Sequence, residues 1–149
     1  MAGKTDAFEY NVLLMVFNGT GISSICSSVG TTDLWVGLHT ADPGDAGSTA
    51  SEGGYAQYTR IATDRSTASN GWEVTSGTSA AKASASPVGN VDMPQNTSTT
   101  TGTFSYFSIN PSSDSVGSAA LYVGSISPTI NFSQNVTPRI TTSSSITED

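Results

Sequence analysis

Short runs of β-branched and aromatic residues recur along the chain, and turn-forming clusters separate them. The clearest runs are "DLWVGLH", "TFSYFSIN" and "ALYVGSIS". In the first, Leu34, Val36 and Leu38 stand at every second position, the period of a half-buried strand. The separators, such as "ADPGDAGSTASEGG" and "NPSSDSVGS", are rich in Gly, Pro, Asp and Ser. This spacing predicts an all-β chain, a jelly-roll-like β-sandwich with strands between about residues 33 and 147.

Further segments fit weaker strand patterns. They are "YAQYTRIA", "NGWEVTS", "TINFSQ" and "RITTSSSIT", whereas "SAAKASAS" fits a helical turn or a weak strand equally well. The Asn70-Gly71 dipeptide that opens "NGWEVTS" is a hairpin-type turn signal. A length of 149 residues fits one domain, so we expect a single β domain over residues 1–149.

One segment, at about residues 6–18, predicts a helix. Asp6 can act as its N-cap, with Glu9 three residues later in a capping-box pattern. Asn18 and Gly19 supply the stop signal. The chain is therefore expected to begin with one N-terminal α-helix followed by strands.

This helix is apolar on more than one side. Phe8, Val12 and Met15 recur at helical spacing, and Phe17 lies with other apolar residues beyond that stripe. A helix with so broad an apolar surface needs cover from several directions. It can pack across one end of the β domain, or it can also contact another chain, and the sequence leaves both interpretations open.

The charge of the chain limits its partners. Charged residues make up only 11% of the sequence, and disorder usually combines low hydrophobicity with high charge, so an ordered chain is favoured. The net charge is −7, with five Lys and Arg in all. Nucleic acids and anionic lipids need clustered cations. No run approaches the roughly 18 apolar residues of a membrane span. The sequence thus predicts no nucleic-acid or membrane partner.

A lone histidine, His39, stands close to two acids, Asp42 and Asp45, at the end of a predicted strand. One histidine cannot build a His-rich zinc site, and no "GxSxG" elbow is present to support a catalytic triad. A loose Ca²⁺ site from Asp42, Asp45 and Glu52 is a minor alternative, because the spacing is not that of an EF-hand. We therefore predict no catalytic residue, no metal and no cofactor.

The same residues have a structural interpretation as a turn. Asp42 would cap it, Pro43 would pre-set its backbone, and Gly44 would accept a positive φ. His39 would hydrogen-bond the adjacent turn. The one cysteine, Cys26, excludes a disulfide within the chain and is typical of a small buried residue.

The stretch "LWVGLHTADPGDAG", followed by Glu52 and "GGYAQYTR", resembles a family of small bacteriophage virion proteins. Trp72, "NVDMP", "TGTFSYFSI", "GSAALYVGSIS" and the terminal "ITED" extend the similarity over nearly the whole chain. Two features depart from the family pattern: Met93 stands where an aromatic residue is common before Pro94, and a Gly usual near the last strand is missing. Members are often labelled tail-fibre proteins. Those that resemble known virion components are similar to jelly-roll capsid cement proteins, often trimeric.

The resemblance implies a non-enzymatic capsid decoration or cement protein on the outer capsid surface of the virion. Its expected partners are the major capsid protein and further copies of the chain, in a trimer. A tail-fibre or baseplate component is the alternative within the same class. The candidate interface comprises helix residues and residues of the corner after the first strand: Phe8, Val12, Met15, Phe17, Asp42, Pro43, Asp45 and Glu52.

A function of another class, a carbohydrate-binding module, would require exposed aromatic side chains that stack on sugars. The candidates are Trp35, Tyr55, Tyr58, Trp72, Tyr106 and Tyr122. The competing interpretation places these rings in the core. A flat row of exposed rings on one sheet would distinguish the two.

Overall fold

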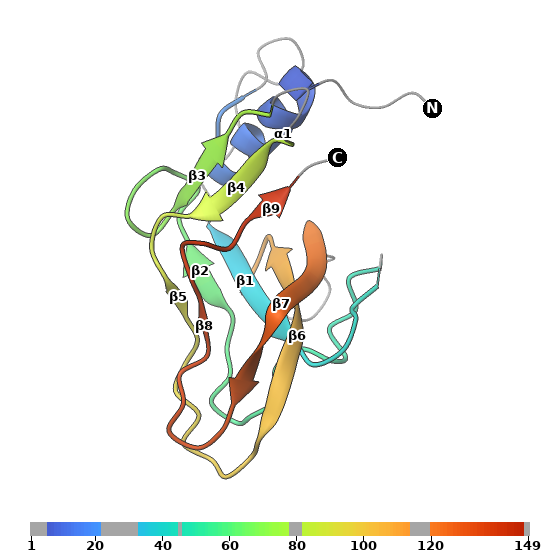
Figure 1. Ribbon diagram of the computed structural model, residues 1–149, viewed down its shortest axis with the longest axis vertical. Coiled ribbons are helices and arrows are strands. Elements are labelled where there is room, and N and C mark those ends of the chain that lie inside the picture. The colour runs from blue at the N-terminus through green and yellow to red at the C-terminus, as the bar shows by residue number, and fades with distance from the viewer. Residues whose placement is uncertain (1–5, 22–32, 45, 78–81, 114–119, 148–149) are drawn as a thin grey trace. The chain divides into compact units, whose positions relative to one another are not determined.

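A computed structural model describes residues 6–21, 33–44, 46–77, 82–113 and 120–147. In these residues a single helix precedes a series of strands that form three sheets, of orders β2-β1-β6-β7, β3-β4-β9 and β5-β8 (Figure 1). The predicted mainly β architecture with one N-terminal helix is confirmed. The elements are α1 (Asp6–Asn18), β1 (Leu34–His39), β2 (Ile61–Thr63), β3 (Trp72–Thr75), β4 (Ser84–Pro87), β5 (Val91–Asp92), β6 (Gly102–Asn110), β7 (Tyr122–Phe132), β8 (Arg139–Ile140) and β9 (Ile146–Thr147).

The chain divides into two compact units. Unit 1 comprises Met1–Thr32, Thr63–Asn90 and Thr141–Asp149, and unit 2 comprises Asp33–Ala62 and Val91–Ile140. Unit 1 holds α1 and the sheet of β3, β4 and β9, while unit 2 holds β1, β6 and β7 and the small β5-β8 sheet. The single domain and the jelly-roll topology stay predictions. In the described part of the chain, no helix has the length and apolar character needed to span a membrane.

Several strand boundaries differ from the predicted ones. "ALYVGSIS" and "TINFSQ", predicted as two strands, form the single strand β7. Pro128, which lies within β7, cannot donate to a ladder. It lies between Ser125 and Ile130, where the register with β6 shifts, so an irregularity accommodates it without ending the strand.

Two other predicted strands are shorter than expected. In "YAQYTRIA" only the last residues enter β2, because the Tyr58 amide donates to the Tyr55 carbonyl in a turn. "RITTSSSIT" divides into β8 and β9, because the Ser144 amide turns back to the Thr141 carbonyl. The ambiguous "SAAKASAS" contributes the start of β4, and β5 was not predicted.

Unit 1 is organised around one tryptophan. Leu13 and Phe17 of α1 are fully buried, and the Phe17 ring lies 4.7 Å from the ring of Trp72, centroid to centroid. The Trp72 indole N–H donates to Thr63 Oγ1 at 3.0 Å, and Asn18 Nδ2 donates to the Trp72 carbonyl at 2.9 Å. The helix is therefore fixed to β3 by apolar burial and by a hydrogen bond at its last residue.

An arginine from outside the helix donates hydrogen bonds to free carbonyl groups at the C-terminal end of α1. The last carbonyls of a helix have no partner within it, and the last turn of α1 carries no basic residue. Arg65 Nε donates to the Val16 carbonyl at 2.6 Å, and Arg65 Nη2 donates to the Met15 carbonyl. The guanidinium thus places a positive charge at the negative end of the helix dipole.

We expect the substitution Arg65→Met to destabilise the protein by about 2 kcal/mol, because it removes two charge-assisted hydrogen bonds from half-buried carbonyls. Chemical denaturation followed by circular dichroism measures the loss. Arg65→Lys keeps the charge and one donor, so it should retain part of the stability. Equal stability of Arg65→Met and the unmodified protein would contradict this role.

Candidate functional site

The face of β1 that carries Gly37 and His39 is buried in unit 2. The predicted apolar face, Leu34, Val36 and Leu38, is buried as expected, but Gly37 and His39 on the opposite face are buried as well. β1 pairs with β6 so that Gly37 lies opposite Ser108 and His39 opposite Tyr106. This polar face of the sheet is covered by side chains from residues 52–60, and it is the candidate functional site.

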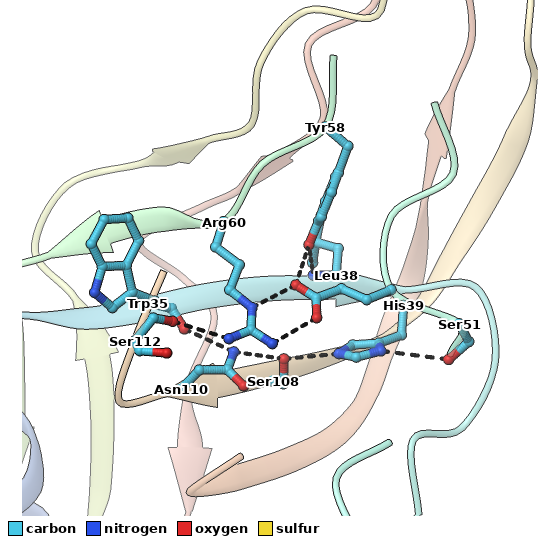
Figure 2. A network of polar contacts seen from close by, with 10 residues as sticks. Trp35, Leu38, His39, Ser51, Tyr58, Arg60, Ser108, Asn110 and Ser112 are labelled. Atoms are coloured by element: carbon cyan, nitrogen blue, oxygen red, sulfur yellow. Dashed lines mark hydrogen bonds and ion pairs between the residues drawn. The ribbon is translucent and has the colours of Figure 1, made fainter. Parts of the chain in front are cut away.

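A buried ion pair lies at the centre of the site (Figure 2). Arg60 Nε donates to Glu52 Oε1 and Nη2 to Oε2, each at 2.7 Å, and the two side chains are only 2% and 5% exposed. Arg60 Nη1 also donates to the Ser112 carbonyl at 3.0 Å. Tyr58 Oη donates to Glu52 Oε1 at 3.3 Å and accepts from the Leu38 amide at 2.7 Å. The bidentate geometry is that of the strong class of ion pairs.

A chain of hydrogen bonds runs from β6 to His39. Asn110 Nδ2 donates to the Trp35 carbonyl at 3.0 Å and to Ser108 Oγ at 2.9 Å. Ser108 Oγ lies 2.8 Å from His39 Nε2 (Figure 2). Asn110, Ser108 and His39 are each about 1% exposed, so these bonds replace water for all three side chains.

Gly37 leaves the space that this network occupies. A Cβ atom at this position would lie 2.7 Å from Ser108 Oγ and 2.9 Å from Glu52 Oε1. Both separations are shorter than a carbon–oxygen contact allows. The ion pair and the serine therefore approach the backbone of β1 only because this residue has no side chain.

Burial sets the protonation states of the site. Desolvation holds the pKa of His39 below its usual value of 6.5, and the charge of Arg60 acts in the same direction, whereas Glu52 opposes them. Burial also raises the pKa of Tyr58 far above its usual value of 10.0. At neutral pH the imidazole is uncharged and the phenol protonated, so Glu52 and Arg60 carry the charges at the centre of the network.

The corner loop, described for residues 40–44 and 46–52, leaves the end of β1 and returns to it through a bridge between His39 and Glu52. The Thr40 amide donates to the Ser51 carbonyl at 3.0 Å, which closes the loop. At its tip the Gly44 amide donates to Asp42 Oδ1 at 2.8 Å, and Gly44 has a φ of +64°. The predicted turn roles of Asp42 and Gly44 are confirmed. Hydrogen bonds therefore hold the corner loop at its base and at its tip, and its last residue, Glu52, belongs to the buried ion pair.

His39 has the structural role predicted for it, but with an additional partner. Its Nδ1 lies 3.5 Å from Ser51 Oγ at the base of the corner, a weak contact with the turn. The closer contact is the one to Ser108 on β6. That partner could not be predicted, because the pairing of β1 with β6 is not visible in the sequence.

The predicted interface residues differ in their accessibility. In unit 1, Phe17 is fully buried, Val12 and Met15 are half-buried, and Phe8 is 37% exposed. Their role as an interface stays a prediction, and the burial of Phe17 leaves Phe8 as the most accessible of the four.

The corner residues also differ in their accessibility. In unit 2, Asp42 is exposed, Pro43 is buried and the Glu52 side chain is occupied by Arg60. Asp45 and Cys26 lie outside the described residues. Among the residues that are described, no three His, Cys, Asp or Glu side chains come together where they could hold a metal ion.

The aromatic side chains considered for sugar binding are turned inward or divided between units. The Tyr55, Phe104 and Phe132 rings pack together in unit 2, and the Tyr58 ring contacts those of Tyr55 and Phe104. Trp72 belongs to unit 1. All seven Trp and Tyr residues of the chain are buried or half-buried. They do not form the exposed row that a carbohydrate-binding surface requires.

Comparison with known proteins gives one family. The model of a family described as "Podophage GP4 fiber I protein gp80" matches residues 4–146, which include the described elements of unit 1 and unit 2 except the last residue of β9. No curated protein matches the chain.

We expect Arg60→Met to destabilise the protein by about 3–5 kcal/mol, because it leaves the Glu52 carboxylate buried without its cation. The matched control is Arg139→Met. Arg139 also makes a bidentate pair, with Asp92, but both side chains are nearly half exposed, so its loss should leave stability essentially unchanged. Denaturant titration of the two variants measures the difference, and similar losses for both would contradict a special role for the buried pair.

We expect Gly37→Ala to cost about 1–3 kcal/mol of stability, because the added methyl forces Ser108 or Glu52 to move. Adding Ser108→Ala removes the closest of the clashing atoms. The double variant should therefore be more stable than Gly37→Ala by itself, although Ser108→Ala in the unmodified protein is destabilising. Thermal unfolding of the three variants tests this opposite sign. If Ser108→Ala lowers stability equally in both backgrounds, Gly37 does not serve as the space for this network.

Proposed function

Because the chain belongs to the family described as podophage GP4 fiber I protein gp80, we propose that it forms part of a fibre of a phage particle. The family is one of phage virion structural proteins, and the chain therefore has a virion structural role. Its match extends from residue 4 to residue 146, so the proposal draws on nearly the whole chain. The fibre assignment itself rests on the description of this family as fibre proteins.

The observation that supports a structural role is that the buried polar side chains of unit 2 bond to one another. Glu52 and Arg60 neutralise each other, and His39 is an uncharged member of a hydrogen-bond chain. Each of these groups has a partner in unit 2. A fibre subunit needs loops and sheets of fixed conformation more than it needs reactive side chains. The polar network fixes the base of the corner loop in this way.

A capsid decoration protein is the second candidate function. Two features favour it. The net charge of −7 suits an outer surface better than a lining against packaged nucleic acid. The stretch "LHTADPGDAG" resembles a family of phage virion proteins, some of whose members are similar to capsid cement proteins. In that case the partner would be the major capsid protein. Several weak contacts made by one oligomer would act together and slow its dissociation.

In either role we propose that the chain acts as an oligomer, with a trimer as the expected number. The partly exposed apolar residues of α1, Phe8, Val12 and Met15, supply one candidate contact. The exposed part of the corner loop around Asp42 supplies another. Symmetric assembly would repeat both contacts around one axis.

The test is the place and number of the chain in purified particles. A fibre subunit should be present in few copies relative to the major capsid protein, and antibody labelling in electron micrographs should lie on fibres. Particles without the chain should keep their heat stability and lose adsorption to host cells. Complementation with the Arg139→Met variant, which changes an exposed pair, should restore adsorption as fully as the unmodified chain does.

Two other outcomes would contradict the fibre proposal. Copies in proportion to the capsid lattice, with genome release at a lower temperature in their absence, would favour the decoration role instead. Complete absence of the chain from infectious particles would exclude both roles.

A further inference from the structure

We propose that His39 makes closure of the corner loop dependent on protonation: the neutral imidazole holds the loop closed, and uptake of one proton opens it. This inference concerns unit 2 itself and is independent of whether the chain serves in a fibre or on the capsid. It rests on the direction of the hydrogen bonds at the site, on the burial of His39 and on the charges that face it.

The neighbours of His39 favour one tautomer of the neutral imidazole. Asn110 uses its two amide hydrogens on the Trp35 carbonyl and on Ser108 Oγ. Ser108 is then free to donate its hydroxyl hydrogen to His39 Nε2, 2.8 Å away. In this arrangement the Nε2 atom accepts the hydrogen and carries no proton of its own. The proton of the imidazole therefore lies on Nδ1.

The second ring nitrogen faces the base of the corner loop. Ser51 Oγ donates to the Ala41 carbonyl at 2.9 Å, so it can only accept from His39 Nδ1. Ser51 also supplies the carbonyl that accepts from the Thr40 amide and from Thr40 Oγ1. The residue in contact with the imidazole is thus the same residue that closes the loop.

A second proton on His39 disrupts this arrangement. It would sit on Nε2 and point at Ser108 Oγ, whose own hydrogen would then lose its acceptor. His39 is 1% exposed, so water cannot replace that acceptor without opening the site.

The charged and titratable groups that face His39 come from two elements. From residues 52–60 these are Glu52, Arg60 and Tyr58, and from β6 it is Tyr106, which lies opposite His39 in the register. Glu52 favours the imidazolium, but its carboxylate is already bound through both oxygens by Arg60. Burial and the Arg60 charge outweigh it, and the pKa of His39 is lowered.

The sign of the pH effect follows from linkage. The open loop exposes His39, which then has its usual pKa of 6.5, whereas the closed loop holds that pKa lower. As the pH falls below 6.5, the open form takes up one proton that the closed form does not. Opening therefore becomes about tenfold more favourable for each pH unit, until the closed form also binds the proton.

Two NMR measurements on the unmodified protein test this. His39 is the one histidine of the chain, so its ring signal needs no further assignment. The pH dependence of that signal gives the pKa of His39 directly. Amide hydrogen exchange at Thr40 and Ser48, both bonded within the corner, reports opening. Their protection factors should fall about tenfold per pH unit below 6.5, while that of Met93, bonded to Pro138 elsewhere in unit 2, stays constant.

The variant His39→Gln separates a proton effect from a merely structural one. Its side-chain oxygen can accept from Ser108, but it cannot take up a proton. The corner amides of this variant should show no pH dependence in the same range. The proposal is overturned if His39 titrates at or above 6.5, if the corner amides keep their protection while His39 titrates, or if His39→Gln retains the slope. Should the variant not fold, the first two criteria decide on the unmodified protein.

Discussion

The ion pair of Glu52 and Arg60 is the interaction on which the organisation of unit 2 depends. Two charges removed from water are costly unless their geometry is good and every remaining donor has a partner. The pair is bidentate, and the third guanidinium nitrogen donates to the Ser112 carbonyl. Gly37 provides the necessary space on β1. The polar face of the sheet and the base of the corner loop follow from this placement, whereas the neutral state of His39 follows from its burial.

Unit 1 has a different organisation, but here too an arginine makes specific hydrogen bonds. Its helix is fixed by Leu13 and Phe17 against β3, and the end of that helix is satisfied by Arg65 rather than by a residue of its own. Among the described residues, Arg60, Arg65 and Arg139 each make specific contacts. A chain with few charges, in which an ion pair is buried inside unit 2, is suited to a structural role in a virion.

Local features could be predicted from the sequence because their causes are local. The helix over residues 6–18, the strand ending at His39 and the turn roles of Asp42 and Gly44 follow from periodicity, capping and backbone preference. The division of β7 into two predicted strands was wrong, because a register shift with β6 accommodates Pro128 within one strand.

The buried site could not be predicted, because its members meet only through long-range pairing. Ser108 and Asn110 lie about 70 residues from β1 along the chain and reach it through the β1–β6 register. Two signals were present all the same. A glycine inside a strong strand pattern, Gly37, indicates close approach of other groups. An arginine inside the apolar "YAQYTRIA", in a chain with so few cations, indicates a buried partner.

The central claim is that Glu52 and Arg60 act as one unit, and a double-mutant cycle tests it most directly. The free energy of unfolding is measured for the unmodified protein, for Glu52→Gln, for Arg60→Met and for the double variant. If the pair organises the site, the double variant should be little worse than either single one, with a coupling of about 2 kcal/mol or more. Additive losses, with no coupling between the two residues, would contradict the account.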